Sequence, residues 1–308
     1  MANGSLTVAP PHRDLLDRCH FPSPGSPLDC AVSGGPDSLA LLVLATAAGC
    51  RVTAWHVDHG LRPGSGGEAG IVADAANRYG AAFQARKVDV GKGPNLEDRA
   101  RQARRAALPP RAATGHTADD QAETVLLNLI RGSGLDGLAG MRAGQVHPIL
   151  GLRRSETHAL CALEGLDPVQ DPTNHDPAFR RNRLRAEALD VLARVGERDL
   201  VPVLARQAEL LAEEADLLDE LAAGLDPTDA LVMAGAPIAL ARRAVRAWLR
   251  SGEGHPPTSA DVARVLDVAR GRSRATELTG GGSVKRSGQR LRRVASLAQP
   301  HPTDQPSR

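Results

Sequence analysis

Strand-like and helix-like segments alternate along the chain from Leu28 to about Ile149, and this alternation constrains the fold more than any other feature. Short apolar runs predict four strands, at residues 28–32, 51–57, 81–89 and 111–115. Each run is followed by a segment in which apolar residues have helical spacing, at 38–48, 68–79, 96–108 and 119–131. The pattern predicts an α/β fold with a parallel sheet covered by helices, in which ligands bind outside the carboxyl ends of the strands.

The pattern changes at Asp199, where leucines and valines begin to recur seven residues apart. This spacing predicts a long amphipathic helix over 199–225, and two shorter helices are expected at 237–250 and 259–270. Glycines within 277–295 predict a hairpin, and the Pro-rich tail is expected to be disordered. We therefore expect an N-terminal segment (1–27), an α/β domain (28–198), a smaller, mainly helical domain (199–298) and a tail (299–308).

The composition is that of an ordinary soluble protein, with 42% hydrophobic and 24% charged residues among 308. No run approaches 18 apolar residues, so no membrane span is expected. The first residues lack the layout of a signal peptide, which predicts a cytoplasmic protein. The four cysteines are scattered and form no C-x-x-C pair, which argues against disulfides and against a cysteine-built zinc or iron–sulfur site.

Basic residues are concentrated in two regions although the net charge is only +2. One region contains Arg180, Arg181, Arg183 and Arg185. The other runs from Arg272 to Arg293 and contains seven basic residues and a single acid. Such regions indicate a nucleic-acid partner, although a solvated basic surface is the commoner explanation of any one of them.

The first predicted strand leads directly into the loop Ser33-Gly34-Gly35-Pro36-Asp37-Ser38. A glycine-rich turn before a helix presents backbone N–H groups and the positive end of the helix dipole to an anion such as phosphate. An acid in this place repels phosphate unless a cation lies between them, so Asp37 predicts bound Mg²⁺. A plain helix cap explains the loop about as well, and the lysine of a Walker A loop is absent.

The loop resembles the S-G-G-x-D-S pyrophosphate loop of the N-type ATP pyrophosphatases, the PP-loop superfamily. Three further stretches follow: "HVDHGLR" (56–62), "GHTADDQAETVLLNLIRGSGLDGLAGM" (115–141) and "DPTNHDPAFRRNRLR" (171–185). In this order they resemble the tRNA(Ile)-lysidine synthase family. The resemblance implies a Rossmann-like PP-loop domain that binds ATP and Mg²⁺. It also implies ligation of free L-lysine to C2 of the wobble cytidine of tRNA(Ile) with a CAU anticodon, through an adenylated cytidine, with release of AMP and pyrophosphate.

The resemblance also assigns roles to individual residues. The expected catalytic residues are Asp37, Arg101, Arg104, His116, Asp120 and Glu123. The expected ATP-binding residues are Ser33, Gly34, Gly35, Pro36, Asp37, Ser38, His56 and Asp58. Lysine is expected at Asp120 and Glu123, which share a helical face with Asp119. The expected tRNA contacts are Arg181, Arg185, Lys285, Arg286 and Arg290.

Other interpretations remain open for several of these residues. Thr117 and Asp120 form a T-x-x-D capping box, and arginines on the helix at 96–108 can be a solvated basic face. The nearest alternative function is a tRNA 2-thiolation enzyme, whose members commonly carry C-x-x-C pairs. A small-molecule amidating synthetase or an inactive tRNA-binding protein would share the loop. A homodimer is compatible with the sequence, which leaves the oligomeric state open.

Overall fold

The structure is a computed structural model that describes residues 10–58, 66–88, 91, 96–169, 176–250 and 256–295. The chain divides into two compact units, Met1–Ala212 and Glu213–Arg308. The division falls within helix α10 (Leu200–Ala223), whereas the sequence pattern placed the domain boundary just before that helix. The tail predicted at 299–308 lies outside the described residues.

The first unit contains a parallel sheet with the strand order β3-β2-β1-β4. Its strands are β1 (Pro27–Ala31), β2 (Arg51–Asp58), β3 (Ala82–Lys87) and β4 (Ala113–Thr114). Strand β1 pairs with both β2 and β4, and its Cys30 lies opposite Ala54 on β2 and Ala113 on β4. The predicted parallel α/β sheet is therefore confirmed. Strand β4 is shorter than predicted, and the N–H of Thr114 bonds the carbonyl of Val146, outside the sheet.

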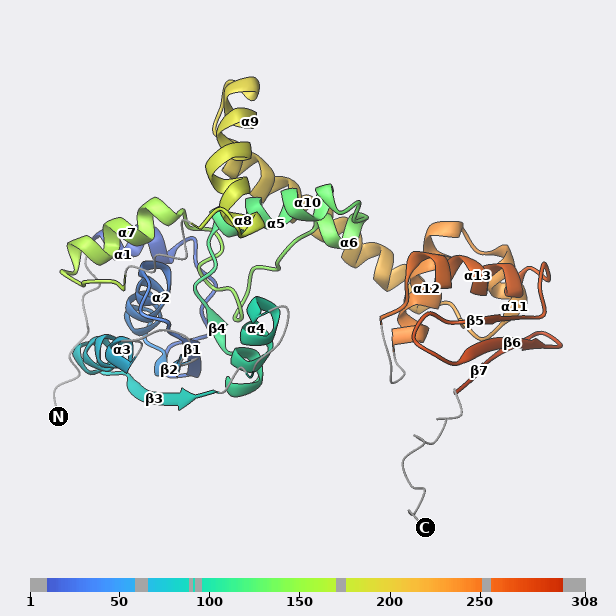
Figure 1. Cartoon of the computed structure of the whole chain (residues 1–308), viewed down its shortest axis with the longest axis horizontal. Helices are drawn as coiled ribbons and strands as arrows, with labels where there is room; N and C mark the ends of the chain where they lie inside the picture. Colours follow the sequence, from blue (N-terminus) through green and yellow to red (C-terminus); the bar gives the residue numbers. More distant parts are fainter. Residues whose placement is uncertain are drawn as a thin grey trace, which may run out of the picture. The chain divides into compact units, whose positions relative to one another are not determined.

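Helices follow the strands in the predicted order: α2 (Pro36–Ala47), α3 (Gly66–Arg78), α4 (Leu96–Ala107) and α5 (Ala118–Ile130). Helix α2 is central, and all of its residues from Ser38 to Ala45 are buried. It packs against the sheet and against α1 (Pro10–Leu16) and α7 (Arg154–Leu163), beside which it lies in Figure 1. Since α2 begins in the glycine-rich loop, this packing fixes the loop at the carboxyl end of β1.

The remaining helices of the first unit were not predicted in detail. They are α6 (Leu135–Leu138), α8 (Arg180–Arg183), the π-helical turn η2 (Leu184–Ala188) and α9 (Leu189–Gly196). Helix α8 continues through η2 into α9, so the arginines of the first basic region lie on one helical segment that contacts α5. A π-helical turn within an α-helix frequently marks a functional site.

The second unit combines helices with a small antiparallel sheet. Helices α11 (Ala230–Gly235), α12 (Ile238–Arg250) and α13 (Ser259–Ala269) precede strands β5 (Ala275–Glu277), β6 (Ser283–Ser287) and β7 (Arg290–Val294). Strands β6 and β7 form the predicted hairpin, and Gly288 takes a positive φ of 59° in its turn. Strand β5 was not predicted, and α13 packs against β5 and β6 (Figure 1). No helix in the described part of the chain is long and apolar enough to cross a membrane.

Asp261 connects α13 to the turn between β5 and β6 from a fully buried position. Its Oδ2 accepts hydrogen bonds from the N–H and the hydroxyl of Thr258, at 2.8 and 2.6 Å, and its Oδ1 accepts from the N–H and the hydroxyl of Thr279, both at 2.9 Å. Burial acts to raise the pKa of Asp261, but the hydrogen bonds from both threonines outweigh it and hold that pKa well below its ordinary value. The ionised carboxylate therefore stabilises the second unit.

Candidate functional site

The order of the strands determines where a ligand can bind in the first unit. The chain leaves β1 toward β2 on one side, and β4 lies on the other side of β1. The carboxyl ends of β1 and β4 therefore flank a topological switch point, where open α/β sheets bind their ligands. The glycine-rich loop follows β1, and residues 115–123 follow β4, so both predicted motifs meet here.

Hydrogen bonds of Ser38 fix the conformation of the glycine-rich loop at the start of α2. Ser38 Oγ accepts from the N–H of Ser33 at 3.1 Å and donates to the carbonyl of Gly35 at 2.8 Å. Gly34 has a positive φ of 88°, and a Cβ in its place would lie 2.8 Å from Val169 Cγ2. The N-cap of α2 is Gly35, which has no side chain with which to cap the first N–H groups of the helix. These N–H groups suit an anion.

Gly115 brings the end of β4 into contact with the start of α2. A Cβ at Gly115 would lie 2.6 Å from the carbonyl oxygen of Asp37 and 2.9 Å from the nitrogen of Ser38. Only glycine fits this approach between two backbones. Because of this close contact, His116 and the start of α5 lie beside Asp37.

Three of the predicted acids converge on one arginine. Arg154 Nε lies 3.6 Å from Asp37 Oδ2, its Nη2 lies 3.1 Å from Asp120 Oδ1, and its Nη1 lies 3.3 Å from Glu123 Oε1. We refer to Asp37, Asp120 and Glu123 as the acidic cluster. Thr157, one turn after Arg154 on α7, donates its hydroxyl to Asp37 Oδ1. Helix α7 thus links the loop after β1 to the helix after β4.

Glu123 is fully buried and forms ion pairs with two further arginines. Arg181 Nε lies 2.7 Å from Glu123 Oε2, and Arg185 Nε lies 2.8 Å from Oε1. Arg181 also donates to the carbonyl of Asp120 and to the hydroxyl of Thr124, at 3.1 and 2.9 Å. Both arginines were predicted to contact tRNA. In the structure both form ion pairs with Glu123 and stay partly exposed, while Arg180 and Arg183 on the same helical segment are exposed.

The surroundings shift the pKa values of two acids in opposite directions. Burial raises the pKa of Asp37 above its ordinary value, and the bond from Thr157 and the charge of Arg154 only partly offset this. Burial also acts to raise the pKa of Asp120, but Arg154 and the N–H of Thr117 outweigh it and lower that pKa overall. Two neighbouring acids with pKa values shifted apart are typical of reaction sites.

Asp119 is separated from the acidic cluster, although it was expected on the same helical face. Its Oδ2 accepts from the N–H of Arg154 at 2.8 Å and from Arg153 Nε at 3.1 Å. Arg153 also pairs with Asp199. Asp119 therefore holds the start of α7 in place.

The predicted histidines lie at the carboxyl ends of β2 and β4. His56 is buried, and its Nδ1 lies 3.0 Å from the carbonyl of Val32, which precedes the loop. Because Nδ1 faces an acceptor, it carries the proton, and Nε2 is then an acceptor that has no partner. His116 Nδ1 lies 2.7 Å from the hydroxyl of Thr114, which also lies 2.8 Å from His147 Nδ1.

Other predicted residues are not brought into the acidic cluster. Arg104 is exposed on α4, and Asp58 ends β2. The side chain of Arg101 and residues 170–175, which include most of the turn in the last motif, lie outside what the structure describes.

The predictions from the sequence did not include Arg154 and Thr157. One signal could have identified Arg154, because it stands at the start of a helix, where the dipole disfavours positive charge. Residues that oppose a local preference are often functional.

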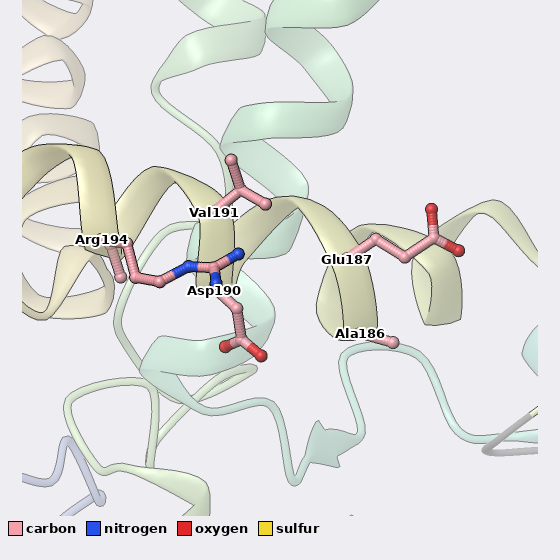
Figure 2. Close-up of a pocket in the computed structure, with 6 residues that line it drawn as sticks. Ala186, Glu187, Asp190, Val191 and Arg194 are labelled. Carbon is pink, nitrogen blue, oxygen red and sulfur yellow. The ribbon is translucent and has the colours of Figure 1, made fainter.

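A surface pocket of about 570 Å³ lies along η2 and α9, directly after the last of these motifs (Figure 2). Its lining comes from one helical segment and includes Glu187, Asp190, Val191 and Arg194. It has no glycine-rich turn to hold phosphates, which makes it unsuitable for a nucleoside triphosphate. The switch point remains the candidate site.

No group of three His, Cys, Asp or Glu side chains among the described residues is arranged to hold a metal ion. Mg²⁺ bound with a nucleotide commonly uses only one or two carboxylates, with substrate phosphates and water as the other ligands. Asp37 and Asp120, which both contact Arg154, fit that requirement.

Comparisons with known proteins agree with this architecture. Residues 14–192 match the family model described as the PP-loop domain, and residues 230–292 match the TilS substrate binding domain. A tRNA(Ile)-lysidine synthase of Nocardia farcinica is 42% identical over 282 residues, which cover 86% of this chain and 88% of the relative. One of Mycolicibacterium paratuberculosis is 46% identical over 238 residues, covering 72% and 74%.

Among solved structures, the U34-tRNA thiolase NcsA from Methanococcus maripaludis, with its 4Fe-4S cluster, is similar with a TM-score of 0.50. It is 16% identical, and the match covers 66% of this chain and 78% of the thiolase. At this identity the similarity supports the fold alone.

Proposed function

The chain belongs to the tRNA(Ile)-lysidine synthase family of PP-loop enzymes, and we propose that its acidic cluster is where the reaction of that family takes place. The enzyme is an ATP-dependent ligase that joins free lysine to C2 of the wobble cytidine of tRNA(Ile) with a CAU anticodon. The observation that carries the assignment of the site is the convergence of Asp37, Asp120 and Glu123 at the switch point.

The reaction has two steps. The O2 atom of the cytidine attacks the α-phosphorus of ATP, the bond from that phosphorus to the bridging oxygen breaks, and pyrophosphate leaves. The ε-amine of lysine then attacks C2, the C2–O2 bond breaks, and AMP leaves with the oxygen while the amine gives up a proton. The acids of the cluster are the candidates to accept this proton.

The glycine-rich loop would hold the pyrophosphate portion of ATP. Its uncapped N–H groups at the start of α2 and the hydroxyl of the exposed Ser33 are suited to phosphate oxygens. Arg101 and Arg104 on α4 remain proposals for the same phosphates. Mg²⁺ would be held by Asp37, with Asp120 as a second carboxylate, and would neutralise phosphate charge.

The nucleoside would lie beside the end of β2. The unpaired Nε2 of His56 supports this placement, because a buried acceptor without a partner costs free energy that a donor on the ligand would recover. Asp58 ends the same strand. His116 lies in the segment between β4 and α5, and its charge acts to lower the pKa of Asp120.

Lysine is proposed to bind through its ammonium at Asp120 and Glu123. Since arginines occupy both oxygens of Glu123, Asp120 is the more accessible of the two acids before substrates bind. Glu123 would act partly by fixing the arginines that surround the ammonium.

The second unit would contact the body of the tRNA through one face of its sheet. Lys285 lies directly opposite Arg292 in the register, and both are exposed, while Val284 and Leu291 are buried on the other face. Exposed cations at this spacing suit phosphates. We therefore propose Lys285 and Arg292 as the main contacts of this unit.

Two arginines predicted to contact tRNA have partners inside the second unit. Arg286 donates to the carbonyls of Ala269 and Gly288 and to Gln289 Oε1, at 2.6, 2.9 and 2.9 Å. Arg290 pairs with Asp226 and donates to Thr228. Arg286 is thus better suited to holding the hairpin than to binding RNA, and Arg290 would contact tRNA only beside an acid.

A tRNA 2-thiolation enzyme is disfavoured, because the sequence has no C-x-x-C pair and its four cysteines are free. The domain limits predicted from the sequence, the cytoplasmic location and a homodimer also remain proposals. Light scattering of the purified protein would test the homodimer.

The decisive experiment is incubation with labelled lysine, ATP, Mg²⁺ and tRNA(Ile) bearing a CAU anticodon. Label in the RNA that depends on ATP supports the proposal, and methionine tRNA with the same anticodon is the matched control. ATP cleavage without label in the RNA would reject lysine as the nucleophile.

A further inference from the structure

Arg154 occupies the centre of the acidic cluster, and it lies outside all of the sequence motifs. Each nitrogen of its guanidinium faces a different carboxylate: Nε faces Asp37, Nη1 faces Glu123 and Nη2 faces Asp120. Its side chain is 20% exposed, so the guanidinium can be reached by a ligand. We infer that Arg154 is a further catalytic residue, which leaves the acidic cluster to contact the phosphates of ATP during adenylation. This inference rests on the proposed function.

The distances distinguish Arg154 from the other arginines of the site. Charge-assisted hydrogen bonds between nitrogen and carboxylate normally measure about 2.7–2.9 Å. Arg181 and Arg185 meet this value at Glu123, with 2.7 and 2.8 Å, whereas the three contacts of Arg154 measure 3.1, 3.3 and 3.6 Å. Arg154 is shared by three carboxylates without a short bond to any of them. Such a guanidinium can turn to a phosphate while Glu123 keeps two firm partners.

The position of α7 puts Arg154 within reach of the phosphates. Helix α7 packs against α2, and Thr157 bonds Asp37, the second residue of α2. The guanidinium therefore already lies beside the turn where the uncapped N–H groups would hold pyrophosphate. Rotation about its flexible side chain would turn it from the acids toward the α- or β-phosphate.

Negative charge on the phosphates of ATP would favour a movement of the Arg154 guanidinium toward them. ATP cannot approach Asp37 and Asp120 without cations, and charge accumulates on the α-phosphate and on pyrophosphate as the bond between them breaks. Preorganised cations at such positions are a main source of catalysis in phosphoryl and nucleotidyl transfer. Arg154 would supply one positive charge there in addition to Mg²⁺.

Two neighbouring arginines allow a matched experiment. Arg153 stands one residue earlier at the start of α7, but pairs with Asp119 and Asp199 outside the acidic cluster. Arg154→Met and Arg153→Met each remove one cation from the same helix end. Pyrophosphate release, the Kd for ATP with Mg²⁺, the Kd for tRNA and the thermal midpoint would be measured for both variants.

Arg154→Met is expected to lower kcat for pyrophosphate release about 100-fold, as for loss of one preorganised donor, with less than a tenfold change in the Kd for ATP. Arg153→Met should retain kcat within about threefold of the wild type. Arg154→Lys should recover at least tenfold over Arg154→Met, because a charge remains within reach of the phosphates.

Two results would overturn the inference. One is an Arg154→Met variant whose kcat stays within threefold of that of Arg153→Met. The other is an Arg154→Lys variant that recovers nothing, which would assign the residue a structural role. Failure of the proposed function is a separate result, since it requires a wild-type enzyme that forms no lysidine at all.

Discussion

Gly115 offers a sharp test of how the site is assembled. In Gly115→Ala, the new Cβ would lie 2.6 Å from the oxygen and 2.8 Å from the carbon of the Asp37 carbonyl. Carbon and oxygen atoms without a bond pack at no less than about 3.2 Å, so the two backbones must separate by about half an ångström. Overpacking of this kind costs about 1–3 kcal/mol in the free energy of unfolding. Displacement of Asp37 relative to Asp120 should also lower kcat, by about 10- to 100-fold.

The tryptophans allow this cost to be measured in the first unit alone. Trp55 lies on β2 in the first unit, and Trp248 lies on α12 in the second. In a Trp248→Phe background, urea unfolding followed by fluorescence reports on the first unit. Gly70→Ala is the control, because Gly70 is helical and has no atom near the added Cβ. It should stabilise the unit by about 0.5–1 kcal/mol and leave kcat unchanged. Wild-type stability and kcat in Gly115→Ala would refute the argument for close approach.

Three further predictions concern charged residues. Glu123→Gln removes the charge that faces three arginines. It should raise the KM for lysine about ten- to a hundredfold, through loss of roughly 1.5–3 kcal/mol of binding free energy, and raise the KM for ATP less. Equal changes of both KM values in steady-state kinetics would argue against a lysine site. Replacing Lys285 and Arg292 with glutamate should weaken tRNA binding and leave the affinity for ATP unchanged. In filter-binding assays, the slope of log K against log salt should fall in magnitude by about 0.9 for each lost phosphate contact. An unaltered slope would contradict the proposed interface. Asp261→Asn should destabilise the second unit at neutral pH. The folded pKa of Asp261 is depressed, so its stabilisation is present above the unfolded pKa of about 3.9 and is lost as the pH falls further. The difference in urea midpoint between variant and parent, read from Trp248 in a Trp55→Phe background, should therefore stay constant from pH 7 to about pH 5 and shrink as the pH falls below about 4. A difference that does not change between about pH 7 and pH 3 would contradict this.

The sheet and the loop could be predicted because their signals are local. Each strand and the helix after it differ in periodicity, and parallel pairing then places the carboxyl ends of the strands at one edge. This is sufficient to bring Asp37 and Asp120 together although they lie 83 residues apart in the sequence. The short strand β5 has no comparable signal, because Ala275–Glu277 is defined by pairing with β6 and not by its own pattern.

The arginines could not be placed because their directions depend on packing between distant elements. Arg181 and Arg185 belong to a basic region that usually indicates a solvated or nucleic-acid-binding surface. They pair with Glu123 because it is buried between Ala122 and Val125, and a buried carboxylate requires positive partners. Arg154 meets the acids only because α7 packs on α2. For Arg181 and Arg185, the clue in the sequence was an acid among the apolar residues of a helix.

The pairing of the acidic cluster before substrates bind has a consequence for the order of binding. Both oxygens of Glu123 face arginines, and Asp120 Oδ1 faces Arg154, so an arriving ammonium finds these carboxylates already paired. If Arg154 turns to the phosphates of ATP, Asp120 Oδ1 becomes available to lysine. We therefore expect lysine to bind at least tenfold more tightly when a non-hydrolysable ATP analogue and Mg²⁺ are present, a coupling of about 1.4 kcal/mol. Equilibrium dialysis with labelled lysine measures this coupling directly. In Arg154→Met, Asp120 Oδ1 has no arginine partner from the start, so the coupling should largely disappear through tighter binding of lysine without nucleotide. Equal lysine affinity with and without the analogue in the wild type would show that Arg154 does not compete with the substrate.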